Sequence, residues 1–266
     1  MIAKFSTFSD RVGRATFAIV EEVAHGALLF LESFYWLLVG WRKNQPVRID
    51  SIFMQMMEMG VRAVPIVTVL AGTIGVMLAI QGIYTLRTFG AESRVVVGIA
   101  LSITREFSAL ITGILIAGRS GSALAARLST MKINQEVDAL CVIGINPVRF
   151  LVAPALVAMI IMLPILTIWS DIVGLFVAGI YVSLDLGISM AAYIDQTVDV
   201  LKVDDVMHGL QKTIIFAILI TLVGVASGNS VTGGAEGVGR VTTRSVVVSI
   251  TLIVIADMLF AFLTTR

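Results

Sequence analysis

Five stretches of the sequence are apolar over about twenty residues or more, and no other feature restricts the possible folds so strongly. A helix needs about 20 consecutive apolar residues to cross the hydrocarbon core of a membrane. A backbone in lipid must satisfy its own hydrogen bonds, which a helix does within one segment. The stretches therefore predict an all-α membrane protein with five transmembrane helices. They cover residues 64–86, 95–117, about 150–181, about 207–227 and 245–263.

The composition excludes most soluble folds. Hydrophobic residues make up 58% of the 266 residues and charged residues only 14%, whereas soluble domains carry about 25% charged residues. So few charged side chains cannot cover a surface that faces water on all sides. The net charge of +1 gives no indication of a nucleic-acid partner. Cys141 is the only cysteine, which excludes an intrachain disulfide.

Two of the apolar stretches carry further detail. In the first, Ala71, Gly75 and Ala79 recur at every fourth residue. This spacing predicts close helix contact within the fold, with a dimer seam as the weaker alternative. The third stretch is too long for a straight crossing, and we expect it to tilt or to bend at Pro154 or Pro164.

Residues 1–48 form an N-terminal segment that precedes a transmembrane domain over residues 49–266. Between residues 14 and 41, charged and apolar side chains fall on opposite sides of a helix. A crossing helix would bring the charged stripe into hydrocarbon at roughly 2.5–3.5 kcal/mol per charge. We therefore expect an amphipathic helix that lies in the membrane interface with its charges in water. The stripe consists of Arg14, Glu21, His25 and Glu32, and the opposite side holds Ile19, Val23, Phe30, Phe34, Leu37 and Trp41.

The basic residues predict an orientation in the membrane. With the N-terminus inside, thirteen of the 19 lysines and arginines fall on the inner side, and five, including Lys202 and Lys212, fall on the outer side. Cytoplasmic loops carry an excess of basic residues, so we expect a cytoplasmic N-terminus and an outer C-terminus. The outer segment 185–205 is acidic and too long for a tight turn, which leaves room for a short surface helix.

Motifs of the common enzyme classes are absent from the sequence. It contains no GxxxxGK[ST] motif for binding ATP phosphates, and neither HExxH nor GxSxG occurs. The two histidines, His25 and His208, lie far apart in the chain. We therefore expect this chain to be neither an enzyme nor the holder of a metal or cofactor.

Two charged residues lie near the middle of the second apolar stretch. Arg105 and Glu106 are neighbours whose side chains point about 100° apart on a helix, so they are poorly placed to pair with each other. Charged groups in a membrane are costly and often functional. They either line a pathway for water or an amphiphile, or form ion pairs that fix helix packing. For Asp171 and Asp257, nearer the ends of their stretches, snorkelling or a hydroxyl partner is the simpler interpretation.

Residues 129–149 are polar and charged although apolar stretches flank them. A helix over about 130–145 would have an apolar and a polar side, with Gly144 as its C-terminal cap and Pro147 preventing its continuation. On the cytoplasmic side, such a helix is either a passive connector or an element that fits a groove on a cytosolic partner. Its apolar side would hold Ile133, Val137 and Leu140, and its polar side Asn134, Gln135 and Asp138.

Four motifs occur in a characteristic order relative to the apolar stretches: AIQG (79–82), REF within SITREFSAL (102–110), AGRSGSALAARLSTMKINQEVDALCVIGINPVRFLVAP (117–154) and GVGRVTTRSVV (237–247). Together they resemble the MlaE/YrbE permease family, the membrane subunits of MCE-type ABC lipid transporters. The resemblance covers roughly residues 50–266, and the N-terminal amphipathic segment is similar to the interfacial helix of that family.

The resemblance implies a permease subunit of an ATP-driven transporter. Members work as a pair of permease copies, each bound to a separate cytosolic ATPase that holds ATP and Mg²⁺. They move phospholipid or a related lipid between the bacterial inner membrane and a periplasmic MCE protein, which maintains outer-membrane lipid asymmetry or supplies lipid to the envelope. The implied residues are Arg105, Glu106, Gln81, Ile80 and Ser102 for the lipid pathway, Lys132, Gln135, Glu136, Asp138 and Asn146 for ATPase coupling, and Arg240, Thr242, Thr243 and Arg244 for a cytosolic motif that anchors the helix or takes part in coupling.

The chain departs from the family pattern at several positions. Gln135 and Glu136 reverse the usual Glu-Gln order of the coupling helix, which moves the carboxylate by about 100° around a helix axis. Asn146 stands where aspartate is frequent, and Ser108 and Ala109 replace a Gly-Pro pair. The lipid, the direction of transport, the branch of the family and the identity of the second permease copy stay open.

A self-sufficient secondary transporter or channel is the alternative interpretation. It would use Arg105, Glu106 and Asp257 as a relay for protons or ions. Secondary transporters are often built from inverted repeats with paired broken helices, and neither is evident in this sequence.

Overall fold

The computed structural model describes residues 26–40 and 47–264. Within these ranges every regular element is a helix, which confirms the all-α prediction. Five helices among the described residues are long and apolar enough to cross a membrane, so the chain is a multi-pass membrane protein. They are Ile49–Thr88, Glu92–Ile133, Val148–Leu186, Val203–Asn229 and Ala235–Thr264.

The first three crossing helices are interrupted by short π or 3-10 turns. The third begins with the π turn Val148–Val152 and continues as α8 (Ala153–Leu186). A π turn closes its hydrogen bonds over five residues and accommodates an additional residue in the helix. The first consists of α2 (Ile49–Gln55), the π turn Met56–Gly60, the 3-10 turn Val61–Ala63 and α3 (Val64–Thr88). The second consists of the 3-10 turn Glu92–Arg94, α4 (Val95–Ser102), the π turn Ile103–Phe107, α5 (Ser108–Ile116), the π turn Ala117–Gly121 and α6 (Ser122–Ile133). The remaining elements are α7 (Glu136–Val142), the π turn Val148–Val152, α8 (Ala153–Leu186), α9 (Met190–Val200), α10 (Val203–Asn229) and α11 (Ala235–Thr264).

The third crossing helix is longer than the membrane core is thick. α8 has 34 residues and continues through Pro164, which makes it about 50 Å long, against roughly 30 Å of hydrocarbon. Pro154 stands in its first turn, where a missing N–H is tolerated. The helix ends at Gly187, whose φ of 67° is a left-handed conformation that glycine adopts without strain.

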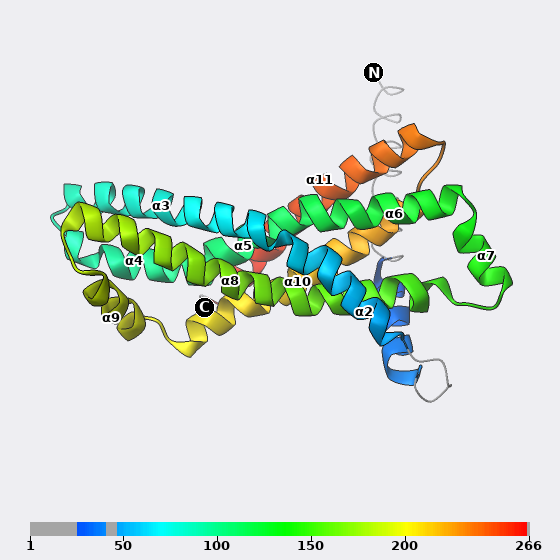
Figure 1. Cartoon of the computed structure of the whole chain (residues 1–266), viewed down its shortest axis with the longest axis horizontal. Coiled ribbons are helices and arrows are strands. Elements are labelled where there is room, and N and C mark those ends of the chain that lie inside the picture. The colour runs from blue at the N-terminus through cyan, green and yellow to red at the C-terminus, as the bar shows by residue number, and fades with distance from the viewer. Residues whose placement is uncertain (1–25, 41–46, 265–266) are drawn as a thin grey trace, which may run out of the picture.

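α8 is the central helix of the bundle and packs against α3, α5 and α10 (Figure 1). Gly75 of α3 lies against the backbone of Gly174 in α8, so closely that no side chain would fit there. Ala71 and Ala79, on the same stripe of α3, are buried as well. The small-residue stripe therefore makes a contact within the fold, as predicted.

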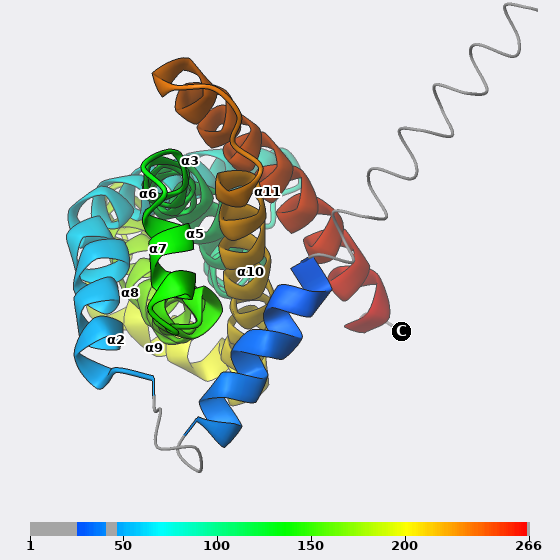
Figure 2. The same ribbon diagram turned by 90° about the vertical axis from the view of Figure 1, so that its right-hand side faces the viewer.

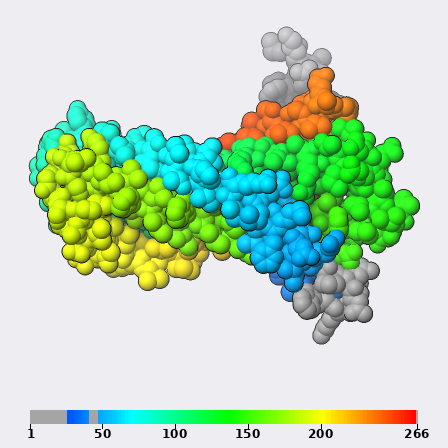
Figure 3. All heavy atoms as spheres, in the orientation of Figure 1, coloured from blue at the N-terminus to red at the C-terminus, as the bar shows by residue number. Residues whose placement is uncertain are grey.

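The molecule is elongated (Figure 3). Two apolar clusters form the core of its described part. The larger joins α5, α6, α8, α10 and α11, and the smaller joins α3, α4, α8 and α9. Fully buried members of the larger cluster include Ile116, Leu163 and Ile220, and the smaller includes Ile83, Val95 and Tyr193.

α7 and α9 lie at opposite ends of the molecule (Figure 1). The acidic segment 185–205 contains α9, as expected for a segment too long for a turn. Tyr193 anchors α9 to α8: its hydroxyl donates to the Leu175 carbonyl at 3.1 Å, and its ring lies where Gly179 leaves space. Burial raises the pKa of the Tyr193 phenol, so it remains a hydrogen-bond donor.

The N-terminal helix Gly26–Val39 lies obliquely across the bundle at the end that carries α7 (Figure 2). Glu32 was expected on a water-facing stripe, but its Oε1 accepts a hydrogen bond from Asn146 Nδ2 at 2.8 Å. The carboxylate faces the fold because Asn146 supplies a donor there, and apolar side chains take the exposed positions. These are Leu28, Leu31, Phe34 and Leu38. The other members of the predicted stripe, Arg14, Glu21 and His25, lie outside the described residues, as does Trp41.

Candidate functional site

The π turn Ile103–Phe107 lies in the first half of the second crossing helix and carries Arg105 and Glu106. Turns of this kind occur frequently at functional sites. Each of the two side chains has its own partner on α10. Arg105 Nε lies 3.2 Å from Oδ1 of Asp205, and Glu106 Oε2 pairs with Nζ of Lys212. The neighbours thus point to different partners, as their angular separation predicts.

Lys212 joins three crossing helices at one point. Its Nζ pairs with Glu106 on the second helix and lies 3.0 Å from Oδ1 of Asp257 on α11. The ring of Phe260 lies 5.7 Å from the same ammonium, measured to its centroid. Since a buried ammonium is stable only when it is paired, the two carboxylates are what allows a lysine at this position. We call Glu106, Lys212 and Asp257 the Lys212 network.

The network is closed on one side and open on the other. The Lys212 side chain is fully buried, that of Asp257 is 16% exposed, and that of Glu106 is 39% exposed. Arg105 is also half-exposed, at 47%, although its partner Asp205 is nearly buried. Arg105 and Glu106 therefore present a cation and an anion, on neighbouring positions, to whatever lies against the exposed side of this crossing helix.

Lys212 and its role escaped the sequence prediction, which counted this residue on the outer side. The structure shows it buried within α10, because carboxylates from two other helices neutralise its charge there. A usable signal was present: Asp205, Gly209 and Lys212 follow the spacing i, i+4, i+7 and so share one face of α10. Gly209 lies directly against the Thr104 carbonyl, so this face contacts the π turn.

The other two aspartates of the crossing helices, Asp171 in the middle of α8 and Asp257 in α11, differ from each other. Asp171 is buried beside the Ser108 side chain, the kind of hydroxyl neighbour that was expected, although its Oδ1 atom has no hydrogen-bond partner. Asp257 was expected to snorkel or to bond a hydroxyl. Instead it approaches the Lys212 ammonium, since α10 brings a buried cation beside it.

The other predicted pathway residues lie away from the ion pairs. Ile80 and Gln81 are on the exposed side of α3, opposite the buried residues Ala79 and Ile83. Ser102 is half-buried at the last position of α4, one turn before Glu106. Within the described residues, no hydrogen bond or ion pair joins Gln81 or Ser102 to the Lys212 network.

Large apolar surfaces accompany these charges. α11 is mostly exposed within a single chain, and α3 has a long exposed side. Monomeric soluble proteins rarely expose contiguous apolar patches of this kind, whereas lipid or another protein can cover them in a membrane. The exposed side chains are Ile66, Val69, Met77, Ile80 and Tyr84 on α3, and Val247, Val254, Ile255, Met258, Leu259, Phe262 and Leu263 on α11.

The predicted coupling helix is two helices rather than one. α6 ends at Ile133, and α7 begins at Glu136. Between them Gln135 has a φ of 59°, a left-handed conformation that costs a non-glycine residue about 1–2 kcal/mol and breaks the helix. At the other end of α7, the N–H of Ile145 bonds the Leu140 carbonyl around Gly144, which has a φ of 81°. Gly144 is therefore the C-terminal cap that the sequence predicted.

Two residues assigned to coupling tie helices together. Lys132 Nζ donates to the carbonyl and the side-chain oxygen of Asn229, each at 2.8 Å, and so fastens the end of α6 to the end of α10. The Oδ1 atom of Asn146 accepts from the Arg149 backbone at 3.0 Å, which caps the start of the third crossing helix. Both residues therefore stabilise the helix ends that flank α7.

α7 itself has the two sides that were expected. Val137 and Leu140 pack against the larger core cluster, whereas Gln135, Glu136 and Asp138 are exposed. Glu136 Oε1 accepts a hydrogen bond from Asn134 at 3.0 Å. The end of the helix also exposes two large apolar side chains, Val142 at 87% and Ile143 at 68%.

The predicted cytosolic motif occupies the first turns of α11. Thr242 and Thr243 bond carbonyls of the preceding turn, so their hydroxyls are satisfied within the helix. Arg240 approaches Glu236 at 3.8 Å, but both side chains are highly exposed, and such pairs contribute little to stability. Arg240, Thr243 and Arg244 line an open groove of about 550 Å³ together with Val247.

Comparison with known proteins identifies the family. Residues 52–263 match the family described as Permease MlaE. The chain belongs to this family. The matched residues cover nearly the whole of the five crossing helices. They include the π turn Ile103–Phe107, the Lys212 network and α7. This MlaE-family chain is therefore a permease subunit.

Relatives with names support this assignment. A probable ABC transporter permease protein of Rickettsia typhi is 32% identical over 254 residues, which cover 94% of this chain and 95% of the relative. One from Synechocystis is 34% identical over 79% of this chain and 80% of the relative. The protein TRIGALACTOSYLDIACYLGLYCEROL 1 of Arabidopsis thaliana chloroplasts is 34% identical over 69% of this chain and 53% of its own length.

Proposed function

We propose that this chain is the permease subunit of an ATP-driven ABC transporter that moves a phospholipid or a related lipid. The observation behind the proposal is the half-exposed pair Arg105 and Glu106 within the second crossing helix. Both side chains have partners on α10, and exposed apolar helices flank them. A lipid matches both properties, because its headgroup is polar or charged and its chains are apolar. The name of the Arabidopsis relative contains that of a glycerolipid, which favours the same class of cargo.

A second permease copy would complete the pathway. In one chain, the exposed sides of α3 and α11 have no protein cover among the described residues. Pairing of two copies would enclose a cavity between these sides, with Ile80, Gln81 and Ser102 toward the cavity and Arg105 and Glu106 near a headgroup. The pairing buries apolar surface and leaves the charged groups accessible to cargo.

The distribution of charge favours the α7 end as cytoplasmic. Basic side chains gather there, and acidic ones gather at the α9 end, which follows the rule that cytoplasmic segments are rich in lysine and arginine. In a bacterial inner membrane the N-terminus would be cytoplasmic and the C-terminus periplasmic. The basic residues are Arg62, Arg119, Arg127, Lys132, Arg149, Arg240 and Arg244, and the acidic ones are Asp185, Asp195, Asp199 and Asp204.

The two ends would meet different partners. α7 offers exposed polar groups, among them Glu136 and Asp138, and an apolar tip at Val142 and Ile143, which suits a groove on a cytosolic ATPase that binds ATP and Mg²⁺. The α9 end would face a periplasmic MCE protein that delivers or receives the lipid. The transporter would thereby maintain outer-membrane asymmetry or supply lipid to the envelope.

The proposal is tested by reconstituting the chain with its ATPase and measuring transfer of a fluorescent phospholipid to an MCE protein. We expect transfer to require ATP and to fall about tenfold in Glu106→Gln, since hydrogen bonds to a charged group contribute about 1.5–3 kcal/mol. Glu92→Gln is the matched control, because Glu92 forms an exposed ion pair with Arg87 at the outer end. Full transfer by Glu106→Gln would restrict the network to a packing role, and transfer driven by an ion gradient without ATP would favour a secondary transporter.

A further inference from the structure

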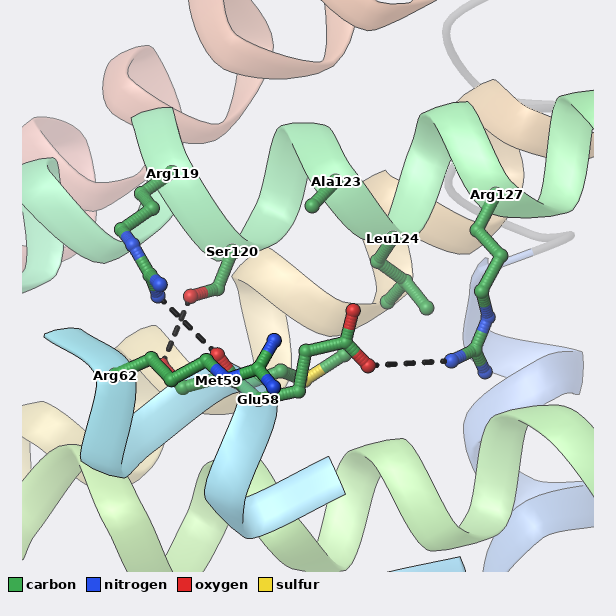
Figure 4. A pocket seen from close by; sticks show the side chains of 8 residues that line it. All are labelled: Glu58, Met59, Arg62, Arg119, Ser120, Ala123, Leu124 and Arg127. Carbon is green, nitrogen blue, oxygen red and sulfur yellow. Dashed lines mark hydrogen bonds and ion pairs between the residues drawn. The ribbon is translucent and has the colours of Figure 1, made fainter. Parts of the chain in front are cut away.

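A pocket of about 180 Å³ lies between the segment around the π turn Met56–Gly60 and the second crossing helix, where the π turn Ala117–Gly121 leads into α6 (Figure 4). Three of its lining residues are arginines and one is a glutamate, so positive charge is in excess. We call it the arginine pocket. Its lining includes Glu58, Arg62, Arg119, Ala123 and Arg127.

The protein itself engages two of the three guanidinium groups. Arg119 donates to the Glu58 carbonyl at 3.2 Å, and Arg127 lies 3.7 Å from the Glu58 carboxylate. Gln55, in the amide orientation that satisfies both groups, accepts from Arg127 at 2.6 and 3.0 Å. The pocket is therefore a built site, with its arginines held in place by neighbouring groups.

Positive charge and donor capacity remain unused. The Arg62 side chain has no hydrogen bond or ion pair with any described residue, and it is exposed on the pocket rim. The Nε atom of Arg127 is buried without an acceptor. An unpaired buried donor is costly, so both observations indicate that an anion with several acceptor oxygens belongs in this pocket.

The position of the pocket favours a lipid as the source of that anion. Arg62 directly precedes the apolar stretch of the first crossing helix, and Arg119 directly follows that of the second, so both lie at headgroup level. Met57 and Val61, on the same segment as Glu58, are exposed apolar side chains at 55% and 43%. A ligand with a phosphate in the pocket would have its acyl chains against this apolar surface.

We propose that the arginine pocket binds the phosphate of an anionic phospholipid from the leaflet at the α7 end. Arginine is suited to this role because its planar guanidinium bonds phosphate oxygens in pairs. This site is separate from the pathway proposed above, since Arg119 is thirteen residues, or about 20 Å, along the helix from Glu106. The proposal does not depend on transport.

The test is a binding measurement on the full chain in nanodiscs of equimolar phosphatidylcholine and phosphatidylglycerol. Native mass spectrometry gives the ratio of the two lipids retained by the protein. Arg62→Gln removes the unpaired charge, and Ala123→Trp fills the pocket from its exposed wall without changing charge. Arg94→Gln removes an exposed charge at the opposite end and is the control.

We expect Arg62→Gln to lower the ratio of phosphatidylglycerol to phosphatidylcholine about fivefold, the usual effect of one basic residue near a lipid surface. Ala123→Trp should lower the ratio as well, because the indole occupies the space of the phosphate. Arg94→Gln and excess inorganic phosphate should leave it unchanged. An unchanged ratio in Arg62→Gln, or an equal loss in Arg94→Gln, would overturn the proposal. Loss of the preference in excess phosphate would identify a free phosphate as the ligand instead. Thermal unfolding of each variant establishes that it is folded.

Discussion

Replacement of Lys212 by methionine isolates the energetic role of the buried cation. Methionine has a similar length and fills the same space, but leaves Glu106 and Asp257 facing each other without a positive charge. Breaking a buried ion pair by removing one partner costs about 3–5 kcal/mol. The loss of the cation destabilises the Asp257 carboxylate almost fully, because its side chain is only 16% exposed. The effect on Glu106 is smaller, because its side chain is 39% exposed. We therefore expect Lys212→Met to lower the free energy of unfolding by about 3–4 kcal/mol.

The two carboxylates should differ in the same experiment. Asp257→Asn removes a nearly buried charge and should cost about 2 kcal/mol, whereas Glu106→Gln should cost about 1 kcal/mol because the pair is more exposed. The triple variant Lys212→Met, Glu106→Gln, Asp257→Asn has no buried charge left unpaired. Since neutral replacements of buried ion pairs are often harmless, it should recover to within about 1 kcal/mol of the original chain.

Unfolding by sodium dodecyl sulfate in mixed micelles, followed by tryptophan fluorescence, measures these differences. The reasoning is refuted if Lys212→Met is as stable as the original chain, or if the triple variant is no more stable than the single one. Either result would mean that the network does not hold α10 and α11 to the second helix.

Two further predictions follow from the packing and from the exposed end. Gly209→Ala should destabilise the fold by about 1–3 kcal/mol in the same unfolding assay, because its Cβ would collide with the backbone of the π turn; Gly98→Ala, with open space around it, should be neutral or slightly stabilising. The double variant Glu136→Ala, Asp138→Ala should weaken co-purification of the ATPase at least tenfold without changing the unfolding midpoint. Asp195→Ala on α9 is the control and should leave co-purification intact. Retention of the ATPase by the double variant would contradict the role of α7.

The sequence predicted the features that the membrane itself imposes. The number of crossing helices follows from apolar length alone, because lipid tolerates no other backbone arrangement in a single segment. Their limits were predicted less well, since Ile49–Thr88 and Glu92–Ile133 extend 15 and 16 residues beyond the apolar stretches 64–86 and 95–117. The surface helix α9 followed from an acidic segment too long for a turn, and Gly144 was recognisable as a cap because left-handed residues are usually glycine.

Features that depend on contacts between distant residues could not be read in this way. Lys212 is neutralised by Glu106 and Asp257, which are 106 and 45 residues away in the chain, and hydropathy gives no information about such pairings. The helix break at Gln135 uses a residue that rarely adopts a left-handed conformation, so its sequence gives no local signal. Glu32 turned toward the fold because of Asn146, a partner 114 residues away.

The π turn at Ile103–Phe107 makes the length of the second crossing helix as important as its composition. An additional residue is accommodated there, and each residue in a helix contributes about 100° of rotation. The turn absorbs this residue, so both halves keep their register. An insertion or deletion elsewhere in the helix would turn one half of the helix against the other by that angle. Arg105 and Glu106 could then no longer both face α10. The segment can therefore accept many substitutions over evolutionary time, but insertions and deletions should be strongly selected against.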